Sequence, residues 1–230
     1  MPANADEVNL GVIVALPAEA AGLPGCDRGC EVFVAGMGCE CARSAAARAI
    51  ERGARAVLSW GVAGGLSPRL RCGDLLLPGR VVSERGEWPT DARLRARFLR
   101  AVPGVHEIDA LYCSDAPAAS LERKRELADR GFAAVDMESA GVAMAAAQAG
   151  APFAVVKAVC DPASRAVPAL AVRMLDERGR LRVPSLLDAA CAGPRAWRKL
   201  RALRGDFSAA RASLRRAAQS LPLRAEAIVP

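Results

Sequence analysis

The chain has 230 residues, of which 52% are hydrophobic and 25% charged, a composition that suits one α/β domain and argues against intrinsic disorder. No apolar run approaches the roughly 18 residues of a membrane span, and Asp6 and Glu7 precede the first apolar stretch, where a signal peptide would be basic. We therefore predict a cytoplasmic protein. Its eight cysteines are scattered, which favours reduced thiols over a disulfide framework.

The net charge of +7 is concentrated at one end of the chain. Residues 195–230 carry nine basic and two acidic side chains, so this segment accounts for the whole net charge. The first 194 residues carry equal numbers of basic and acidic side chains. Any electrostatic attraction to a polyanion therefore belongs to the C-terminal segment.

Apolar runs alternate with helical patterns along the chain. The predicted strands cover residues 9–15, 31–36, 55–60, 74–83, 107–113, 133–135 and 152–160. The predicted helices cover 41–52, 91–102, 120–130 and 138–149, and residues 162–184 read as irregular and then helical. Residues 194–221 read as two basic helices broken near Gly205 and Asp206. This alternation predicts a single-domain α/β three-layer sandwich with a mixed central sheet, followed by the C-terminal basic helices.

Two carboxylates lie at opposite ends of one predicted helix–strand unit. Asp161 ends an apolar strand just before Pro162, and ligands of open α/β sheets bind beyond the carboxyl ends of strands. Glu138 opens the preceding helix, where the positive end of the helix dipole favours a carboxylate. Each also has a structural interpretation, Glu138 as a first-turn acid and Asp161 as a turn former.

Glycines follow two of the predicted strands. Gly36-Met37-Gly38 is a weak match to a dinucleotide fingerprint, because Cys41 stands where a third small residue is wanted. A dinucleotide-dependent oxidoreductase is therefore one alternative function. The run at residues 61–65 contains three glycines and indicates a sharp turn or a close approach to a ligand.

A third acid, Glu19, follows the first predicted strand and could reach the crevice of Glu138 and Asp161. Three acids without a catalytic histidine favour protonation of a leaving group and stabilisation of a cationic transition state, as in glycoside cleavage. The only histidine, His106, is given a surface or structural role. Four cysteines have spacings that fit common zinc modules poorly, so no metal is expected: Cys26, Cys30, Cys39 and Cys41.

Five motifs in a specific order make the chain resemble the nucleoside phosphorylase and nucleosidase superfamily, especially the 5′-methylthioadenosine/S-adenosylhomocysteine nucleosidases. The motifs occupy residues 11–19, 35–38, 61–74, 135–139 and 156–161. The resemblance implies a nucleoside phosphorylase-like catalytic domain over residues 8–190, with a basic amphipathic helical extension over 194–221.

The resemblance also implies residue roles. Asp161 would protonate the purine at N7, Glu19 would position and activate the attacking water, Glu138 would bond the ribose hydroxyls, and Met137 would pack against the sugar. The remaining substrate-binding positions would be Val62, Gly64, Ala116 and Ala118. No organic cofactor is implied. Inorganic phosphate is left open as a co-substrate, and subunit contacts in the superfamily imply a homo-oligomer.

Three residues depart from the nucleosidase pattern. Val62 replaces a usual serine, Pro117 stands where an aromatic residue stacks on the base, and Cys160 replaces the serine before the catalytic aspartate. With the basic C-terminal segment, these features resemble a narrower group, the hopanoid-associated phosphorylases, whose implied reaction removes adenine from adenosylhopane. The alternatives within the superfamily are a methylthioadenosine/S-adenosylhomocysteine nucleosidase and a general purine nucleoside phosphorylase.

Apolar residues recur at helical spacing among the arginines of the C-terminal segment: Trp197, Leu200, Leu203, Phe207, Leu214 and Leu221. Such a helix could lie on an anionic membrane at the inner face, or pack on the domain or a second subunit. A non-catalytic module that binds nucleic acid or lipid is a further alternative, although no specific nucleic-acid partner is expected.

Overall fold

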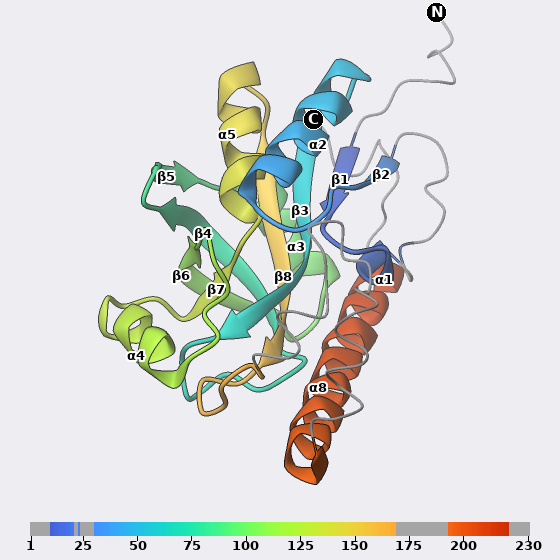
Figure 1. Ribbon diagram of the computed structural model, residues 1–230. Helices are drawn as coiled ribbons and strands as arrows, with labels where there is room; N and C mark the ends of the chain where they lie inside the picture. The colour runs from blue at the N-terminus through green and yellow to red at the C-terminus, as the bar shows by residue number, and fades with distance from the viewer. Residues whose placement is uncertain (1–9, 21–22, 24–29, 169–192, 221–230) are drawn as a thin grey trace, which may run out of the picture.

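The computed structural model describes residues 10–20, 23, 30–168 and 193–220 (Figure 1). Its strands are β1 Leu10–Val14, β2 Cys30–Val34, β3 Ala56–Gly65, β4 Leu75–Ser83, β5 Gly86–Pro89, β6 His106–Cys113, β7 Ala134–Asp136 and β8 Phe153–Asp161. Its helices are α1 Pro17–Ala20, α2 Cys39–Glu51, α3 Ala92–Ala101, α4 Leu121–Asp129, α5 Ser139–Ala149 and α8 Gly193–Ser220.

The described strands form one mixed sheet, part of which closes on itself. The order is β2-β1-β3-β7-β6-β4-β5, and β8 pairs with both β3 and β4. Strand β3 runs parallel to β1 and β8 but antiparallel to β7, while β4 runs parallel to β6 and antiparallel to β8. Strands β3, β8, β4, β6 and β7 therefore make a closed ring. The predicted mixed sheet is confirmed.

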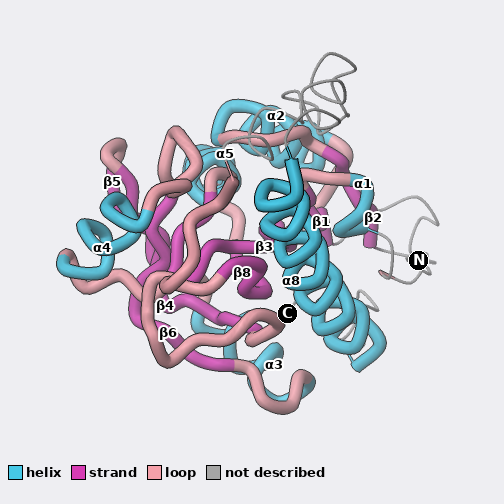
Figure 2. The backbone as a smooth tube through the Cα atoms, turned by 60° about the horizontal axis from the view of Figure 1, so that its bottom comes forward, coloured by secondary structure: helices cyan, strands magenta, loops and turns pink. Residues whose placement is uncertain are grey.

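Helices cover the sheet on both faces. On one face α2 and α5 are Ala-rich and approach so closely that a Cβ atom on Gly141 would lie 2.0 Å from the Cys39 carbonyl oxygen. On the other face α3 contributes Leu94 and Phe98, and α8 contributes Leu214, to a second apolar cluster. Figure 2 shows α8 lying across the sheet beside β3 and β8. The predicted three-layer α/β architecture is confirmed.

The predicted break at Gly205 and Asp206 is wrong, because α8 is one continuous helix of 28 residues. A glycine inside a helix costs only about 1 kcal/mol. Burial of Ala210, Leu214 and Ala217 against the sheet offsets that cost. The C-terminal half of α8 thus packs on the domain, as one interpretation of the sequence had it, and Leu221 lies outside the described residues.

The glycine run at residues 61–65 is not a turn, because β3 continues to Gly65 and pairs with β7 there. The sequence prediction also missed two short elements, the single turn α1 and the largely exposed strand β5. Most of the irregular segment predicted at 162–184 lies outside the described residues. No helix in the described part of the chain is long and apolar enough to span a bilayer.

Candidate active site

The Glu19 carboxylate is held against β3 by backbone N–H groups. It lies on α1, directly after β1, and is 5% exposed. Its Oε2 accepts hydrogen bonds from Ala15 N (3.0 Å) and Leu16 N (2.9 Å), and its Oε1 accepts one from Val62 N (3.0 Å). Burial raises the pKa of Glu19, while the Lys157 charge and these N–H donors act against that rise.

Gly61 is what lets β3 come this close to the carboxylate. A Cβ atom at this position would lie 2.6 Å from Glu19 Oε1, and the backbone φ of +153° is one that side chains with a Cβ rarely adopt. The predicted close approach at residues 61–65 is therefore present, and the group approached is a carboxylate of the protein itself.

Glu138 lies at the N-cap of α5, but its carboxylate reaches the N-terminus of a different helix. Its Oε1 accepts a hydrogen bond of 2.8 Å from the N–H of Gly38, which is the N-cap residue of α2 with a φ of +95°. The Met137 N–H donates to Oε2 at 3.3 Å. Burial raises the pKa of Glu138 to about 7, the nearby Lys157 charge lowers it, and the Asp136 charge raises it further.

This contact also gives the Gly36-Met37-Gly38 turn a role. An N–H that a dinucleotide fingerprint would offer to a pyrophosphate is bonded to Glu138 instead. The Gly38 N–H therefore forms a hydrogen bond with a carboxylate 100 residues away in sequence.

Lys157 is a functional candidate that the sequence prediction missed. It lies in β8, is 2% exposed, and its Nζ is 3.0 Å from Asp136 Oδ2, which also accepts from the N–H of Ser139 at 3.1 Å. Burial lowers the pKa of Lys157, but the charges of Asp136, Glu138 and Glu19 together raise it above its usual value. A lysine inside an apolar strand was the available signal, since an ammonium is buried only with partners.

Asp161 ends β8 and is 7% exposed. A Cβ atom on Gly64 would lie 3.3 Å from its Oδ2, so β3 also passes close to this carboxylate. The Cys160 thiol donates to Oδ1 at 3.2 Å, and burial and the Asp161 charge raise the pKa of Cys160 well above the usual thiol value. The thiol therefore stays protonated and acts as a donor.

Lys124 is the second residue that the sequence prediction missed. It lies on α4, is 1% exposed, forms an ion pair with Asp161 Oδ2, and donates to the Pro162 carbonyl oxygen at 2.7 Å. Its neighbours are charged, so residues 122–126 read as a solvated helix face. The available signal was its position three residues before Leu127, which is also buried.

The structure brings two of the three predicted carboxylates, Glu19 and Asp161, to one part of β3, and Glu138 lies close enough to Glu19 to interact with it electrostatically. Val62 contacts Glu19, and Gly64, about 7 Å further along the strand, contacts Asp161. Glu138 and Glu19 interact electrostatically with each other and with Lys157. The arrangement combines acids that can exchange protons with negative charge that can stabilise a developing cation.

The loop between β6 and α4 contains the last two predicted positions. Ala116 is exposed, whereas Ala118 is buried in an apolar cluster with Tyr112 and Leu127. The Val167 N–H donates to the Ala119 carbonyl oxygen at 2.9 Å, so this loop is tied to the segment that follows Asp161. The Ala116 N–H donates a hydrogen bond to Ser114 Oγ at 3.4 Å.

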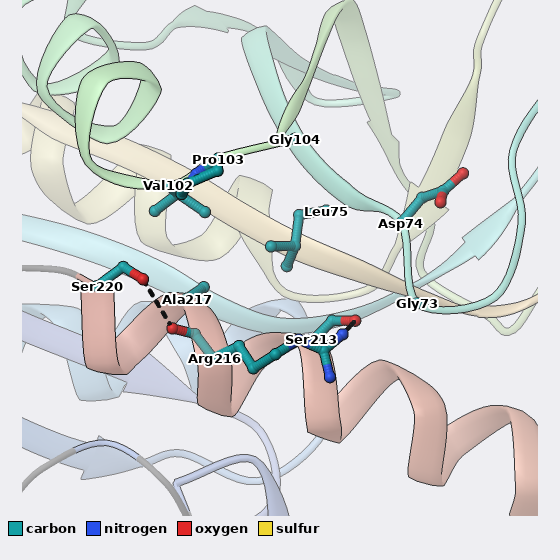
Figure 3. A pocket seen from close by; sticks show the side chains of 10 residues that line it. All are labelled: Gly73, Asp74, Leu75, Val102, Pro103, Gly104, Ser213, Arg216, Ala217 and Ser220. Carbon is teal, nitrogen blue, oxygen red and sulfur yellow. Dashed lines mark hydrogen bonds between the residues drawn. The ribbon is translucent and has the colours of Figure 1, made fainter.

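A cavity of about 360 Å³ lies elsewhere, between α8 and the loops that precede β4 and β6 (Figure 3). None of the three carboxylates lines it. His106 lies near this region, with its Nε2 3.9 Å from Asp74 Oδ2, and is half exposed. Among the described residues no group of histidine, cysteine and acidic side chains is arranged to hold a metal ion, and Cys26 lies outside them.

The fold is similar to several solved structures. A 5′-methylthioadenosine/S-adenosylhomocysteine nucleosidase from Neisseria meningitidis, in complex with methylthio-immucillin-A, is 19% identical with a TM-score of 0.66, covering 92% of this chain and 99% of that one. The corresponding Helicobacter pylori nucleosidase, with butyl-thio-DADMe-Immucillin-A, is 18% identical with a TM-score of 0.67, covering 94% and 99%. Futalosine hydrolase from Helicobacter pylori is 20% identical with a TM-score of 0.60, covering 67% and 88%.

One of two sequence comparisons identifies the family of the chain. A search of curated protein sequences found no significant match. The family model described as "Phosphorylase superfamily" matches residues 28–183, which include Glu138, Lys157 and Asp161. This match covers more than half of the chain and contains every element from β2 to β8, whereas Glu19 on α1 lies before it. The chain therefore belongs to the phosphorylase superfamily.

Proposed function

We propose that this protein is an enzyme that cleaves the N-glycosidic bond of a purine nucleoside, with adenine as the leaving base. The observation that carries the proposal is that one stretch of β3 contacts both Glu19 and Asp161, with Glu138 close enough to Glu19 to interact with it electrostatically. Membership of the phosphorylase superfamily and similarity to solved nucleosidases support it. The catalytic domain would span residues 8–190 and would need no metal or organic cofactor.

The proposed reaction divides the work among the carboxyl groups. Asp161 gives a proton to N7, so that the base leaves as a neutral molecule when the bond to C1′ breaks. Glu138 accepts hydrogen bonds from the ribose hydroxyls, and its negative charge and that of Glu19 stabilise the oxocarbenium-like sugar. Met137 packs against the sugar.

The other predicted positions would shape the site around the substrate. Val62 and Gly64 lie on the stretch of β3 that contacts Glu19 and Asp161, which suits contact with the nucleoside. Ala116 and Ala118 would lie beside the base.

Water is the proposed acceptor, with Glu19 as its base. The Glu19 carboxylate already accepts the N–H groups of Ala15, Leu16 and Val62, which an anion-binding loop would otherwise offer to phosphate. A buried negative charge also repels a phosphate dianion. Val62, moreover, supplies no hydroxyl group for phosphate.

The proposed substrate is an adenine nucleoside with a large apolar 5′ substituent, of which adenosylhopane is the specific candidate. Support comes from Val62, Pro117 and Cys160, which differ from the residues usual in the nucleosidases, and from the resemblance to the hopanoid-associated phosphorylases. Methylthioadenosine and S-adenosylhomocysteine are the second candidates, because two solved structures of similar fold are named as nucleosidases for these substrates.

We also propose that the N-terminal half of α8 associates with an anionic membrane surface, where an apolar substrate would be found. Trp197 is 47% exposed there, and four cations near it are exposed: Arg198, Lys199, Arg201 and Arg204. Tryptophan beside basic residues is typical of helices that bind the membrane interface.

The resemblance to the superfamily also supports a homo-oligomer.

An adenine-release assay tests the function. Adenosylhopane, methylthioadenosine and adenosine are each incubated with the protein, with and without phosphate. We expect release from adenosylhopane without phosphate, and a loss of at least 100-fold in kcat for D161N, as is common when a general acid is removed. Strict phosphate dependence would contradict water as the acceptor, and no release from any of the three would contradict the enzyme proposal.

A further inference from the structure

Lys124 on α4 and Asp161 at the end of β8 form a buried ion pair. Lys124 is 1% exposed and Asp161 7%, and the ammonium contacts Asp161 Oδ2 and the Pro162 carbonyl oxygen. Lys157, the other buried lysine, pairs with Asp136 instead. Lys124 is therefore the ammonium group dedicated to the proposed acid.

Helix α4 holds this ammonium in place. The Ser120 side chain caps the helix by accepting the Arg123 N–H at 3.0 Å, and Leu127, one turn after Lys124, is fully buried against Tyr112 and Val135. Lys124 is therefore oriented by the helix and not by a flexible surface loop. A side chain fixed in this way can present the same N–H to Asp161 at every turnover.

The pair contains a proton that either partner can carry. An ammonium beside a carboxylate has the same number of protons as a neutral amine beside a carboxylic acid. Burial disfavours separated charges, so moving the proton from Nζ to Oδ2 removes two charges from a position with little solvent exposure. An acid that must protonate a base needs such a supply, because a carboxyl group alone is largely ionised at neutral pH.

We propose that Lys124 positions Asp161 and stores the proton that Asp161 gives to the leaving base. This inference rests on the proposed function. The proton moves from Nζ to Asp161, and the carboxyl group gives a proton to N7 as the C1′–N9 bond breaks and its electron pair passes to the base. Asp161 is then a carboxylate again and Lys124 a neutral amine. The amine regains a proton from solvent when the products leave.

Three substitutions separate proton storage from simple charge or packing. K124R keeps the positive charge but cannot release a proton at neutral pH, because a guanidinium remains protonated. K124M removes both the charge and the proton. R125M removes a positive charge from the exposed face of the same helix and serves as the matched control.

The measurements are kcat for base release across pH 5 to 10, using the adenine nucleoside that the wild type cleaves best, and the Tm of each substrate-free variant. We expect K124R to lose kcat by about 100-fold or more with a Tm near that of the wild type. K124M is expected to lose kcat similarly. As pH rises, its remaining activity should be lost at a lower pH than the activity of the wild type. R125M should match the wild type in both.

The substrate-free Tm also reports on the pair itself. K124M leaves a buried carboxylate without its partner and is expected to lower Tm by about 10 °C. The double variant K124M/D161N should recover much of that loss, because neither charge remains. Absence of any recovery would contradict the pairing on which the inference depends.

Two results would overturn proton storage while leaving the proposed function intact. One is a K124R variant that retains half or more of the wild-type kcat, and the other is a K124M variant whose alkaline limb stays in place or moves to higher pH. If K124R fails to fold, the pH profile of K124M decides alone. A wild-type protein that cleaves no nucleoside contradicts the proposed function first and this inference with it.

Discussion

At the scale of single residues, the strongest constraint is the charge balance around Lys157. One ammonium lies among the carboxylates of Asp136, Glu138 and Glu19, and the first of these is 3.0 Å away. Because three acids share one cation, at least one of them takes up a proton readily. Burial raises the pKa of Glu138 to about 7 and also raises that of Glu19, so these two acids are the ones of the cluster that take up a proton most readily.

Glu138→Gln tests this assignment. In the wild type the Glu138 carboxylate, which is proposed to bind the sugar, is protonated as pH falls through about 7, so kcat/KM should show an acidic limb near that pH. The E138Q variant should bind substrate more weakly and should lack that limb. A limb of unchanged position in E138Q would assign the titration to another group.

The same group makes stability depend on pH. Because the pKa of Glu138 is raised from 4.5 to about 7, the native state binds more protons than the unfolded state between these values. The free energy of unfolding is expected to fall by about 3 kcal/mol as pH rises through this window. Chemical denaturation at pH 4.5 and 8 should show this fall in the wild type and a smaller one in E138Q.

Gly61→Ala tests the contact between β3 and Glu19. A Cβ atom 2.6 Å from Glu19 Oε1, at a φ of +153°, must displace the carboxylate or the strand. We expect a loss of about 1 to 3 kcal/mol in unfolding free energy and at least a 10-fold loss of base release. Gly104 also has a positive φ of +72° but open space around it, so G104A should lose stability and keep activity.

At the scale of elements, helix α8 shows how packing overrides local sequence signals. Gly205 and Asp206 predict a break, but the helix passes through them because its C-terminal half is buried on the sheet. Helix α4 shows that packing also decides which charged residue of a helix is buried. Its exposed Arg125 and buried Lys124 are neighbours in sequence, and only the position of the helix over Asp161 distinguishes them.

Gly205→Ala tests the continuity of α8. No atom outside the local helix lies within 4 Å of a Cβ at this position, and Gly205 is exposed. Alanine in an unobstructed helix interior should raise the free energy of unfolding by about 0.5 to 1 kcal/mol. Denaturant unfolding of G205A measures the change, and a lower stability would favour the break that the sequence alone suggests.

At the scale of the whole molecule, α8 forms part of a layer of the fold and also presents a basic surface. Ala210, Leu214, Ala217 and Ala218 are buried among residues of the sheet, whereas four basic residues of the N-terminal half are exposed: Arg198, Lys199, Arg201 and Arg204. The closed ring of strands depends on this layer for cover on one face. The apolar packing of α8 is therefore concentrated in its C-terminal half.

Truncation after residue 192 tests this division. Removal of α8 uncovers an apolar face of the sheet, so we expect loss of the cooperative unfolding transition and aggregation of the product. Serine at four exposed positions should instead leave Tm near the wild-type value and weaken binding to vesicles that contain anionic lipid: Arg198, Lys199, Arg201 and Arg204. A truncated chain that unfolds with the wild-type Tm would show that α8 is dispensable for the fold.

The sequence predicted most of the fold because burial leaves a periodic pattern in each segment. The strands and helices from 41 to 160 appear within a few residues of their predicted bounds. For the glycine run at 61–65 the sequence left a sharp turn and a close approach open, because glycine marks both, and the structure excludes the turn. Lys124 and Lys157 were missed because a charged residue is normally exposed, and its burial depends on acids contributed by other elements.

By itself, the sequence determined the alternation of strands and helices, the three-layer architecture and the places of the acids at the ends of their elements. These properties follow from local periodicity and from where each apolar run stops. Only the tertiary structure decided the partners of those acids: Val62 for Glu19, Gly38 for Glu138, and Lys124 for Asp161. The reason is physical, because a buried charge is stabilised by groups that closure of the sheet brings to it from distant parts of the chain.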